Sequence, residues 1–520
     1  MINIVGTGLA GMSAAIALAE KGRECNLISY QEAERAQSVM AEGGINASLN
    51  TMNENDSIEE HYTDTLKGGS FLADPNAVWG LVNAAPEIVM WLKNLGVPFE
   101  SKNGKIIERN FGGQKKKRTA YVKSSTGKML MSALIDEVRK YEVKGLIHRY
   151  SHHKVYDLVI EDQKCKGLKV LDRYTGETYQ IYGSVLLASG GLAGLFPGMT
   201  TGSSDNTGEL VFRLFSKGLK LANLEMIQYH PTTIGITGKR MLVSEAARGE
   251  GGRFMTYRNN KPYYFMEELY PEEKNLTTRD VATRAVYRIM NDPECSGDVY
   301  LDMTHLDKQI WNTKLSDMRD EIKDYLNIDI SVEPFKIEPG IHYFMGGICV
   351  DEKHHTNIDG LLAAGECCAQ YHGANRLGGN SLLGAIYGGK VAADNITDGE
   401  SGIKKIKEEI KDREIDNVFS LKIRDILRDG MSIIRNKEKL EKAIYDIAVL
   451  KKTSLNKGET EKIIIAQAML ECALKRKESR GAHFREDYPE TDDEYRKTTV
   501  VSYDDGIKIE FADIPERRNS

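Results

Sequence analysis

Short apolar runs separated by glycine-rich turns open the chain. The β-branched run Ile2–Val5 is followed by the turn GTGLAG, and the next segment, MSAAIALAEKG, has the apolar spacing of a helix that ends at a glycine. Residues 24–29 (ECNLIS) form a second apolar run, which predicts another strand. The pattern therefore predicts a strand–helix–strand unit at the N-terminus.

Two later apolar segments also end at glycines. They are residues 183–191 (GSVLLASGG) and 358–365 (IDGLLAAG). Because they lie so far apart, they suggest a nucleotide-binding domain that is interrupted by an insertion, at roughly residues 226–340. From about residue 401 the apolar positions recur at helical spacing among many lysines and glutamates, which predicts helices at 404–415, 435–452 and 460–479.

Composition excludes several functional classes. The chain has 520 residues, enough for two to four domains, and 41% of them are hydrophobic. A net charge of −6 argues against binding to nucleic acid, which usually requires a basic face. No stretch is apolar enough to cross a membrane, and the run from Ile2 lacks the basic residues that precede the core of a signal peptide. We therefore expect a cytoplasmic protein with no membrane span of its own.

The seven cysteines are spread along the chain. Their spacing favours reduced thiols over a disulfide framework, and without a four-cysteine cluster we expect no iron–sulfur centre within this chain. Cys367 and Cys368 are adjacent, and we interpret them as packing residues because catalytic dithiols more usually have CxxC spacing. We assign no metal ligands.

The turn after the first strand has the spacing GxGxxG, formed by Gly6, Gly8 and Gly11. In such a motif the first glycine allows the tight turn, the second lets the backbone approach a pyrophosphate, and the third lets the helix pack on the strand. The helix N-terminus then offers free N–H groups to the phosphates. Ser29 stands where an acidic ribose ligand is usual, so the motif alone leaves FAD and NAD open.

Glycine-flanked segments in the second half of the chain contain several charged or imidazole side chains. Arginine pairs with carboxylates through its planar, bidentate fork. Such a set suggests an anionic ligand, a dicarboxylate, beside a flavin. The side chains concerned are His230, Glu245, Arg248, Arg279, His342 and Arg376.

The motifs QYHPT, EAARGEGG, HYFMGG, HGANRLGGNSL and ESRGAH, in this order, resemble the flavoprotein family of succinate dehydrogenase and fumarate reductase, which also includes L-aspartate oxidase. The resemblance runs from about residue 2 to 493. It implies an α/β protein with a Rossmann-like FAD-binding domain (1–225 and 341–396), an inserted α+β capping domain (226–340), and a C-terminal helical domain and tail (397–520). The active site would lie between the first two.

The resemblance also implies roles for the polar side chains. Hydride would pass between flavin N5 and a C4 dicarboxylate, fumarate or succinate. Arg279 resembles the arginine that passes a proton to the substrate, with Glu245 and Arg248 as the relay leading to it. One substrate carboxylate would be held by His342 and Arg376 and the other by His230 and Ser244.

The cofactor residues are implied in the same way. One group resembles the segment that wraps the flavin and its ribityl chain, and the second resembles the turn beside the adenosine half. Two further glycines belong to the AEGG segment. These residues are Gly365, Glu366, Asn380, Ser381 and Leu382; Ser189, Gly190 and Gly191; and Gly43 and Gly44.

One departure from the family pattern concerns the cofactor linkage. Membrane-bound members attach FAD covalently through a histidine just before the AEGG segment, where this chain has Gln37. We therefore expect noncovalent FAD. In the family a covalent link raises the flavin potential and aids succinate oxidation, so its absence favours the reductive direction. The electron donor implied by the resemblance is an iron–sulfur subunit or another electron-donor protein.

Three alternatives stay open. L-aspartate oxidase has a glutamate that would face the substrate ammonium, and Phe111 occupies that place here, as in the fumarate and succinate members. Reduction of another enoate acid is the second alternative. A flavin electron carrier without chemistry of its own is the third, and the intact catalytic-type positions argue against it.

Overall fold

Five parallel strands form the sheet around which the N-terminal part of the chain is built. The computed structural model describes residues 1–408, 410 and 414–518. The sheet has the order β21-β12-β1-β2-β8, and the predicted strands near residues 2, 24, 183 and 358 are all in it. The strands are Leu361–Ala363, Ser184–Leu187, Ile2–Val5, Cys25–Ile28 and Ile147–Tyr150.

Helix α1 (Leu9–Glu20) follows the glycine turn and is buried along almost its whole length. It begins within the GxGxxG motif, earlier than the apolar spacing predicts. Gly6 has φ +112°, which favours glycine, and directs the chain from β1 into α1. Helix α11 (Asn380–Asn395) packs closely on α1, because a Cβ on Gly389 would lie 2.2 Å from Ala10 O. The helix that follows the nucleotide-type turn is therefore fixed by close packing against α11.

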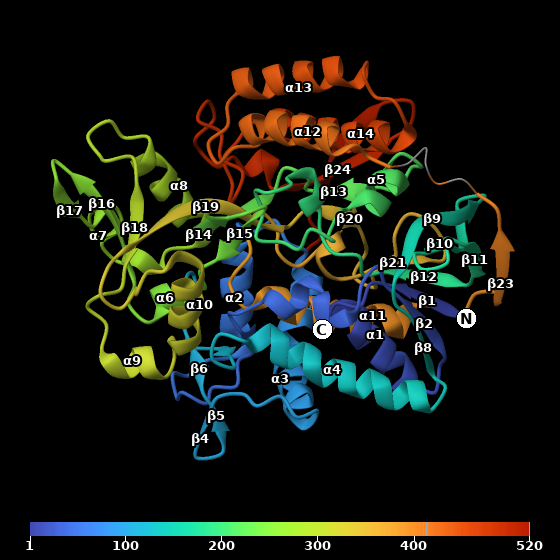
Figure 1. Ribbon diagram of the computed structural model, residues 1–520, viewed down its shortest axis with the longest axis horizontal. Helices are drawn as coiled ribbons and strands as arrows, with labels where there is room; N and C mark the ends of the chain where they lie inside the picture. Colours follow the sequence, from blue (N-terminus) through green and yellow to red (C-terminus); the bar gives the residue numbers. More distant parts are fainter. Residues whose placement is uncertain (409, 411–413, 519–520) are drawn as a thin grey trace.

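Further helices and a small sheet complete this part of the protein. They are α2 (Ile58–Gly68), α3 (Pro75–Asn94), α4 (Thr126–Val143) and α5 (Glu209–Phe215), with β3 (Ile45–Asn46), β6 (Glu108–Arg109) and β7 (Thr119–Ala120) in one sheet. A separate hairpin is formed by β4 (Ser101–Lys102) and β5 (Lys105–Ile106). In Figure 1, α1 and α4 run along the same side of the molecule.

The helix predicted at 404–415 is wrong at its start. Residues Gly402–Ile406 form β23, the edge of a four-stranded antiparallel sheet with β11 (Thr178–Tyr182), β10 (Lys164–Asp172) and β9 (His153–Glu161). Lysines suit an exposed edge strand, and pairing with β11 satisfies the backbone, so tertiary context overrides helix propensity. Residues 409 and 411–413 of the predicted helix lie outside the described part of the chain.

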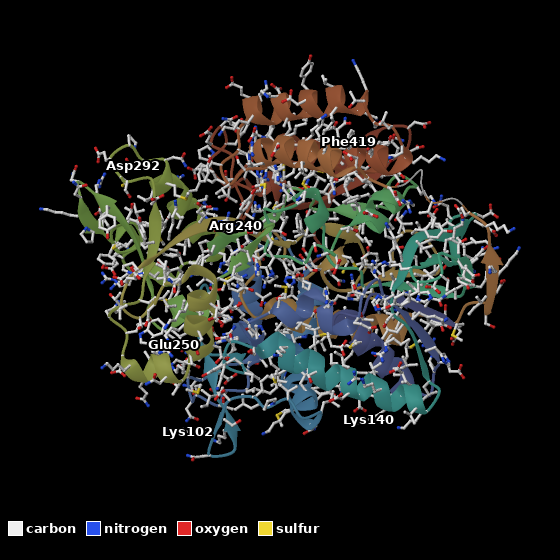
Figure 2. All side chains as sticks on the ribbon, in the orientation of Figure 1. Lys102, Lys140, Arg240, Glu250, Asp292 and Phe419 are labelled. Atoms are coloured by element: carbon white, nitrogen blue, oxygen red, sulfur yellow. The ribbon has the colours of Figure 1, made fainter. Side chains whose placement is uncertain are left out.

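A six-stranded sheet of order β15-β14-β19-β18-β16-β17 forms the yellow-green body at the left of Figure 1. Its long antiparallel pair, β14 (Ile227–Ile236) and β19 (Phe335–Phe344), joins this body to the rest. Arg240, labelled in Figure 2, donates to Thr233 and Glu338 on these two strands. The other elements are β15 (Lys239–Leu242), β16 (Arg253–Arg258), β17 (Lys261–Tyr263), β18 (Val299–Asp302), α6 (Ala246–Gly249), α7 (Phe265–Leu269), α8 (Arg279–Met290), α9 (Lys308–Asn312) and α10 (Ser316–Leu326).

Three C-terminal helices stack at the top of Figure 1: α12 (Asn417–Gly430), α13 (Lys437–Lys451) and α14 (Lys457–Lys475). Phe419, labelled in Figure 2, Ile447 and Leu470 pack in their common core. The sequence predicts that the last helix ends at residue 479, but α14 ends at Lys475 because the backbone of Arg476 is extended. The guanidinium of Arg476 is buried, with Nε 2.8 Å from Glu225 Oε1.

The chain then returns to form a hairpin, β24 (Lys497–Tyr503) and β25 (Ile507–Asp513). This hairpin completes a five-stranded sheet with β13 (Leu221–Ala222), β20 (Gly347–Cys349) and β22 (Cys368–Ala369). Three distant parts of the sequence thus meet in one sheet. The overall α/β fold class is as predicted, and the three domain boundaries stay a prediction. Within the described residues no helix combines the length and the apolar character that crossing a membrane requires.

Candidate active site

One elongated cavity of about 410 Å³ runs from the glycine turn after β1 to the start of α8. Most of the predicted cofactor residues form its wall. They are Gly6, Gly8, Ser29, Gly43, Gly44, Ser189, Gly190, Gly365, Glu366, Ser381 and Leu382. At its far end the wall is formed by Phe111, His230, Ser244, Glu245, Arg279, His342 and Arg376. The fold therefore brings the two predicted groups into one space.

Four predicted site residues lie behind the cavity wall. Gly11 packs α1 on the turn, since a Cβ there would lie 1.9 Å from Gly6 O. Gly191 packs against Glu366. Asn380 is buried and binds other side chains, receiving a hydrogen bond from Asn46 Nδ2 at 2.7 Å. Arg248 is absent from the cavity wall, and its Nη2 lies 3.2 Å from Glu245 Oε1.

The nucleotide end of the cavity fits a dinucleotide. The first turn of α1 faces it, with Gly8 at the N-cap. A side chain at Gly8 would approach Ser38 Oγ at 3.2 Å, a tight contact that glycine avoids. Two buried polar atoms, Ser189 Oγ and Asn206 Oδ1, have no hydrogen-bond partner within the described residues, and both residues line the cavity. Buried polar groups without partners indicate a ligand that satisfies them.

The two histidines of the far end come from the paired strands β14 and β19. Their rings lie 5.2 Å apart in an edge-to-face arrangement. His342 Nδ1 is 2.8 Å from Thr201 Oγ1, and His230 Nδ1 is 3.1 Å from Thr232 Oγ1. Burial, followed by the charge of Arg279, lowers both histidine pKa values well below the ordinary range, so both rings are neutral near pH 7.

Glu245 joins two arginines. Arg279 donates to Glu245 Oε2 from Nε at 2.9 Å and from Nη2 at 2.7 Å, while Arg248 Nη2 lies 3.2 Å from Oε1. The backbone N–H of Gly112 also donates to Oε1, at 2.9 Å. Burial favours the neutral acid, but the two guanidiniums outweigh it and lower the pKa of Glu245. Glu245 is therefore an anion at neutral pH.

Arg376 faces the same space from the loop before α11. It is 2% exposed and stacks on the Tyr343 ring, 4.4 Å from its centroid. Burial, followed by Arg279, lowers the Arg376 pKa to about 9, and the side chain stays mainly charged at neutral pH. In the described part of the chain no carboxylate lies within ion-pair distance of it.

The far end therefore carries excess positive charge. Three buried guanidiniums gather there, and the carboxylate of Glu245 is the one that forms ion pairs with them in the described structure. Burial raises the pKa of Glu366 to about 7 and that of Glu42 well above its ordinary value, so neither adds a full negative charge. The resulting net charge of about +2 matches a dianion.

Several residues of the site were not singled out from the sequence. Gln228 lies two residues before His230 in the motif QYHPT, and Tyr343 directly follows His342 in the motif HYFMGG. Their place in these motifs is the signal that could have found them. Thr201 contacts His342 but has no motif of its own. Glu42 lines the cavity within the AEGG segment, where the sequence argument considered only the glycines.

A parallel sheet, a glycine turn at a helix N-terminus and a cationic pocket at the far end of one cavity define a dinucleotide-dependent oxidoreductase. The FAD binding domain family matches residues 2–382, and the fumarate reductase flavoprotein C-terminal family matches residues 458–517. The chain belongs to the succinate dehydrogenase and fumarate reductase flavoprotein family, which includes L-aspartate oxidase, and it is an FAD-dependent oxidoreductase.

Individual relatives agree with this assignment. The chain is 37% identical to the succinate dehydrogenase flavoprotein subunit of Bacillus subtilis over 99% of its own length and 96% of that protein. It is 34% identical to the L-aspartate oxidase of Pyrococcus furiosus, over 96% and 98% of the two chains. A mutant quinol fumarate reductase chain of E. coli has a similar structure, with 28% identity, a TM-score of 0.87 and coverage of 100% and 97%.

Proposed function

We propose that this protein reduces an unsaturated C4 dicarboxylate of the fumarate type to the saturated acid. The observation that carries the proposal is the net charge of about +2 at the substrate end of the cavity. Three buried arginines lie there, and the carboxylate of Glu245 neutralises only one of their charges. A fumarate dianion supplies the missing charge. Buried cations without counter-ions are costly, so such a site favours a dianionic ligand.

The two carboxylates of the substrate would be held at opposite sides of this end. Arg376 and His342 would bind one carboxylate, and His230 and Ser244 the other. His230 Nε2 is buried without a hydrogen-bond partner within the described residues, which leaves it free to bind a ligand. Cations at both ends also stabilise the negative charge that develops on the substrate during reduction.

Proton delivery is assigned to Arg279. Bound in the cavity, reduced FAD supplies the hydride. Arg279 gives a proton to the adjacent substrate carbon and regains one through Glu245, to which it donates two hydrogen bonds. Arginine is a very weak acid, so this role requires a relay that returns the proton promptly, and Glu245 in direct contact is the first member of that relay. Arg248 lies on the other oxygen of that carboxylate and continues the relay.

The reductive direction is supported by Gln37, which lines the cavity and whose Oε1 accepts a hydrogen bond from Ser203 N. An amide at this place lacks the imidazole that links flavin covalently in some relatives. We infer noncovalent FAD and, with it, reduction in preference to succinate oxidation.

An electron donor must supply the flavin. Several relatives are named as flavoprotein subunits, among them the 8-methylmenaquinol:fumarate reductase subunit of Wolinella succinogenes. We propose an iron–sulfur or other electron-donor protein as the partner, through which the chain could sit at the periphery of a membrane.

L-aspartate oxidation is the competing activity. Phe111 is 1% exposed and its ring lies against the backbone of Gly43 and Gly378, so it provides no charge for a substrate ammonium. Glu42 is a carboxyl group of the cavity wall that the sequence did not single out. Burial raises its pKa well above the ordinary value, which disfavours the negative charge that a substrate ammonium would need.

The deciding experiment is a substrate screen. Purified holoprotein with reduced viologen dye is tested against fumarate, other enoates and iminoaspartate, and succinate and aspartate are tested in reverse with an oxidised dye. We expect the highest kcat/KM for fumarate. Faster aspartate oxidation would overturn the proposed function.

A further inference from the structure

Gln228 is a buried side chain that touches two arginines of the site. It is the second residue of β14, its side chain is fully buried, and it is not part of the cavity wall. Its Oε1 accepts hydrogen bonds from Arg279 Nη1 at 3.1 Å and from Arg376 Nη2 at 3.0 Å. One neutral oxygen is thus shared by two guanidiniums, one from the start of α8 and one from the loop before α11.

The orientation of this amide is fixed by its other end. Gln228 Nε2 donates to Asn375 Oδ1 at 2.9 Å and to Arg376 O at 2.8 Å. A reversed amide would place its N–H₂ group against guanidiniums, which are only donors. All four hydrogen-bonding positions of the amide are therefore used in a single arrangement.

The neutrality of this acceptor has a consequence for charge. A carboxylate between Arg279 and Arg376 would hold them equally well, but it would cancel half of the excess positive charge at the substrate end. The amide oxygen holds the two like-charged groups in place and leaves both charges available to a ligand. Hydrogen bonds to charged groups are strong enough to fix such an arrangement.

We propose that Gln228 is a positioning residue that orients Arg279 and Arg376 toward a dianionic substrate and, being neutral, preserves the charge that selects a dicarboxylate. This inference rests on the proposed function for the identity of the substrate. It adds a residue that lies outside the cavity wall and acts through the two arginines that it binds.

Two substitutions separate orientation from charge. Gln228→Met keeps approximate shape and removes the shared acceptor, and Gln228→Glu keeps the acceptor and adds a negative charge, since two flanking guanidiniums hold the new carboxyl ionised. Gln467→Met on α14, remote from the cavity, is the matched control. FAD content and thermal stability are measured for each variant, so that a folding defect is recognised.

Kinetics give the first readout. Gln228→Met should lower kcat for fumarate by about ten- to a hundredfold, the range for losing a hydrogen bond to a charged group, with a smaller change in KM. Gln228→Glu should mainly raise KM for fumarate, by a similar factor. A residue needed only for packing would be insensitive to Gln228→Glu, or would lose stability equally in both variants.

Ligand binding gives a readout that does not depend on turnover. Malonate and propionate are titrated by calorimetry into the oxidised holoprotein. We expect Gln228→Glu to weaken malonate about ten- to a hundredfold and propionate much less. Unchanged malonate affinity in Gln228→Glu, with full FAD content, would overturn the inference. If the wild-type protein binds malonate and Gln228→Glu weakens that binding, but the wild-type protein does not reduce fumarate, the proposed function fails and the positioning role stands.

Discussion

Arg279 donates two hydrogen bonds to the same carboxylate oxygen of Glu245, one from Nε and one from Nη2. The third nitrogen, Nη1, is bound to the side-chain oxygen of Gln228. Every nitrogen of the guanidinium therefore has a partner before any substrate enters. The group is preorganised, which is the condition for an electrostatic or proton-transfer role without reorganisation during the reaction.

The first prediction follows from this arrangement. Arg279→Gln should lower turnover of fumarate by at least about 10²–10⁴-fold, the usual contribution of general acid catalysis, while FAD stays bound and flavin reduction by dye keeps its rate. Stopped-flow absorbance of the flavin separates the two half-reactions. Arg288→Gln, at an exposed position of the same helix, is the control. Near-normal turnover in Arg279→Gln would refute the assigned role.

The second prediction concerns the cofactor linkage. Acid precipitation should release all FAD into the supernatant, because Gln37 lacks a nucleophilic imidazole. Absorbance of the washed pellet and of the supernatant near the flavin maximum measures the two fractions. Yellow colour that stays in the pellet would contradict the noncovalent assignment.

The third prediction concerns substrate choice. A 2-amino acid brings an ammonium that needs a buried counter-charge, and an uncompensated buried charge costs several kcal/mol. Phe111 supplies none, so kcat/KM for fumarate reduction should exceed that for aspartate oxidation. Phe111→Glu should weaken fumarate turnover by repulsion of its carboxylates and admit aspartate weakly.

Glu42 provides the control for this argument. Glu42→Gln removes a cavity carboxyl group whose pKa is raised by burial, and it should leave the preference for fumarate unchanged. If the unmodified protein prefers aspartate and Glu42→Gln abolishes that activity, Glu42 is the ammonium ligand and the argument from Phe111 is wrong.

The fourth prediction concerns the pH dependence of stability. Lys462 on α14 is 4% exposed, donates to Ser420 Oγ at 3.0 Å, and has its pKa lowered by burial from 10.5 to about 8. Between these two pKa values the unfolded chain binds more protons, so this group makes stability rise with pH across that window. Below pH 8 its charge is buried at full cost.

Lys462→Met should therefore raise the free energy of unfolding near pH 7 by up to about 3 kcal/mol, from 1.36 kcal/mol per pKa unit. The gain should shrink toward pH 10. Denaturant titrations at the two pH values measure it, with Lys451→Met at an exposed position of α13 as the control. An equal gain at both pH values would show that ionisation of Lys462 is not the cause.

The sequence predicts local structure well where one segment contains all the information. The strand, glycine turn and helix around Gly6 depend on neighbouring residues, and they are present. The segment Gly402–Ile406 is different, because it forms an edge strand instead of a helix. Its partner strand β11 lies more than two hundred residues earlier in the sequence. Lysine- and glutamate-rich sequences suit both environments, and only the partner strand decides between them.

The site divides in the same way. Motifs located the arginines and histidines individually, and the fold class followed from them. The shared oxygen of Gln228 could not be predicted, because it depends on Arg279 and Arg376, which lie 51 and 148 positions away in the chain. Such a contact is fixed by how β14, α8 and the loop before α11 meet in space.

The C-terminal hairpin has a consequence for biosynthesis. β24 pairs with β13, and the same sheet contains β20 and β22, which flank the HYFMGG and GECC segments of the cavity. Residues 497–513 leave the ribosome after nearly all of the rest, so the nascent chain exposes the open edge of β13 until then. The sheet that holds β20 and β22 beside the cavity is therefore complete only after β24 has paired with β13.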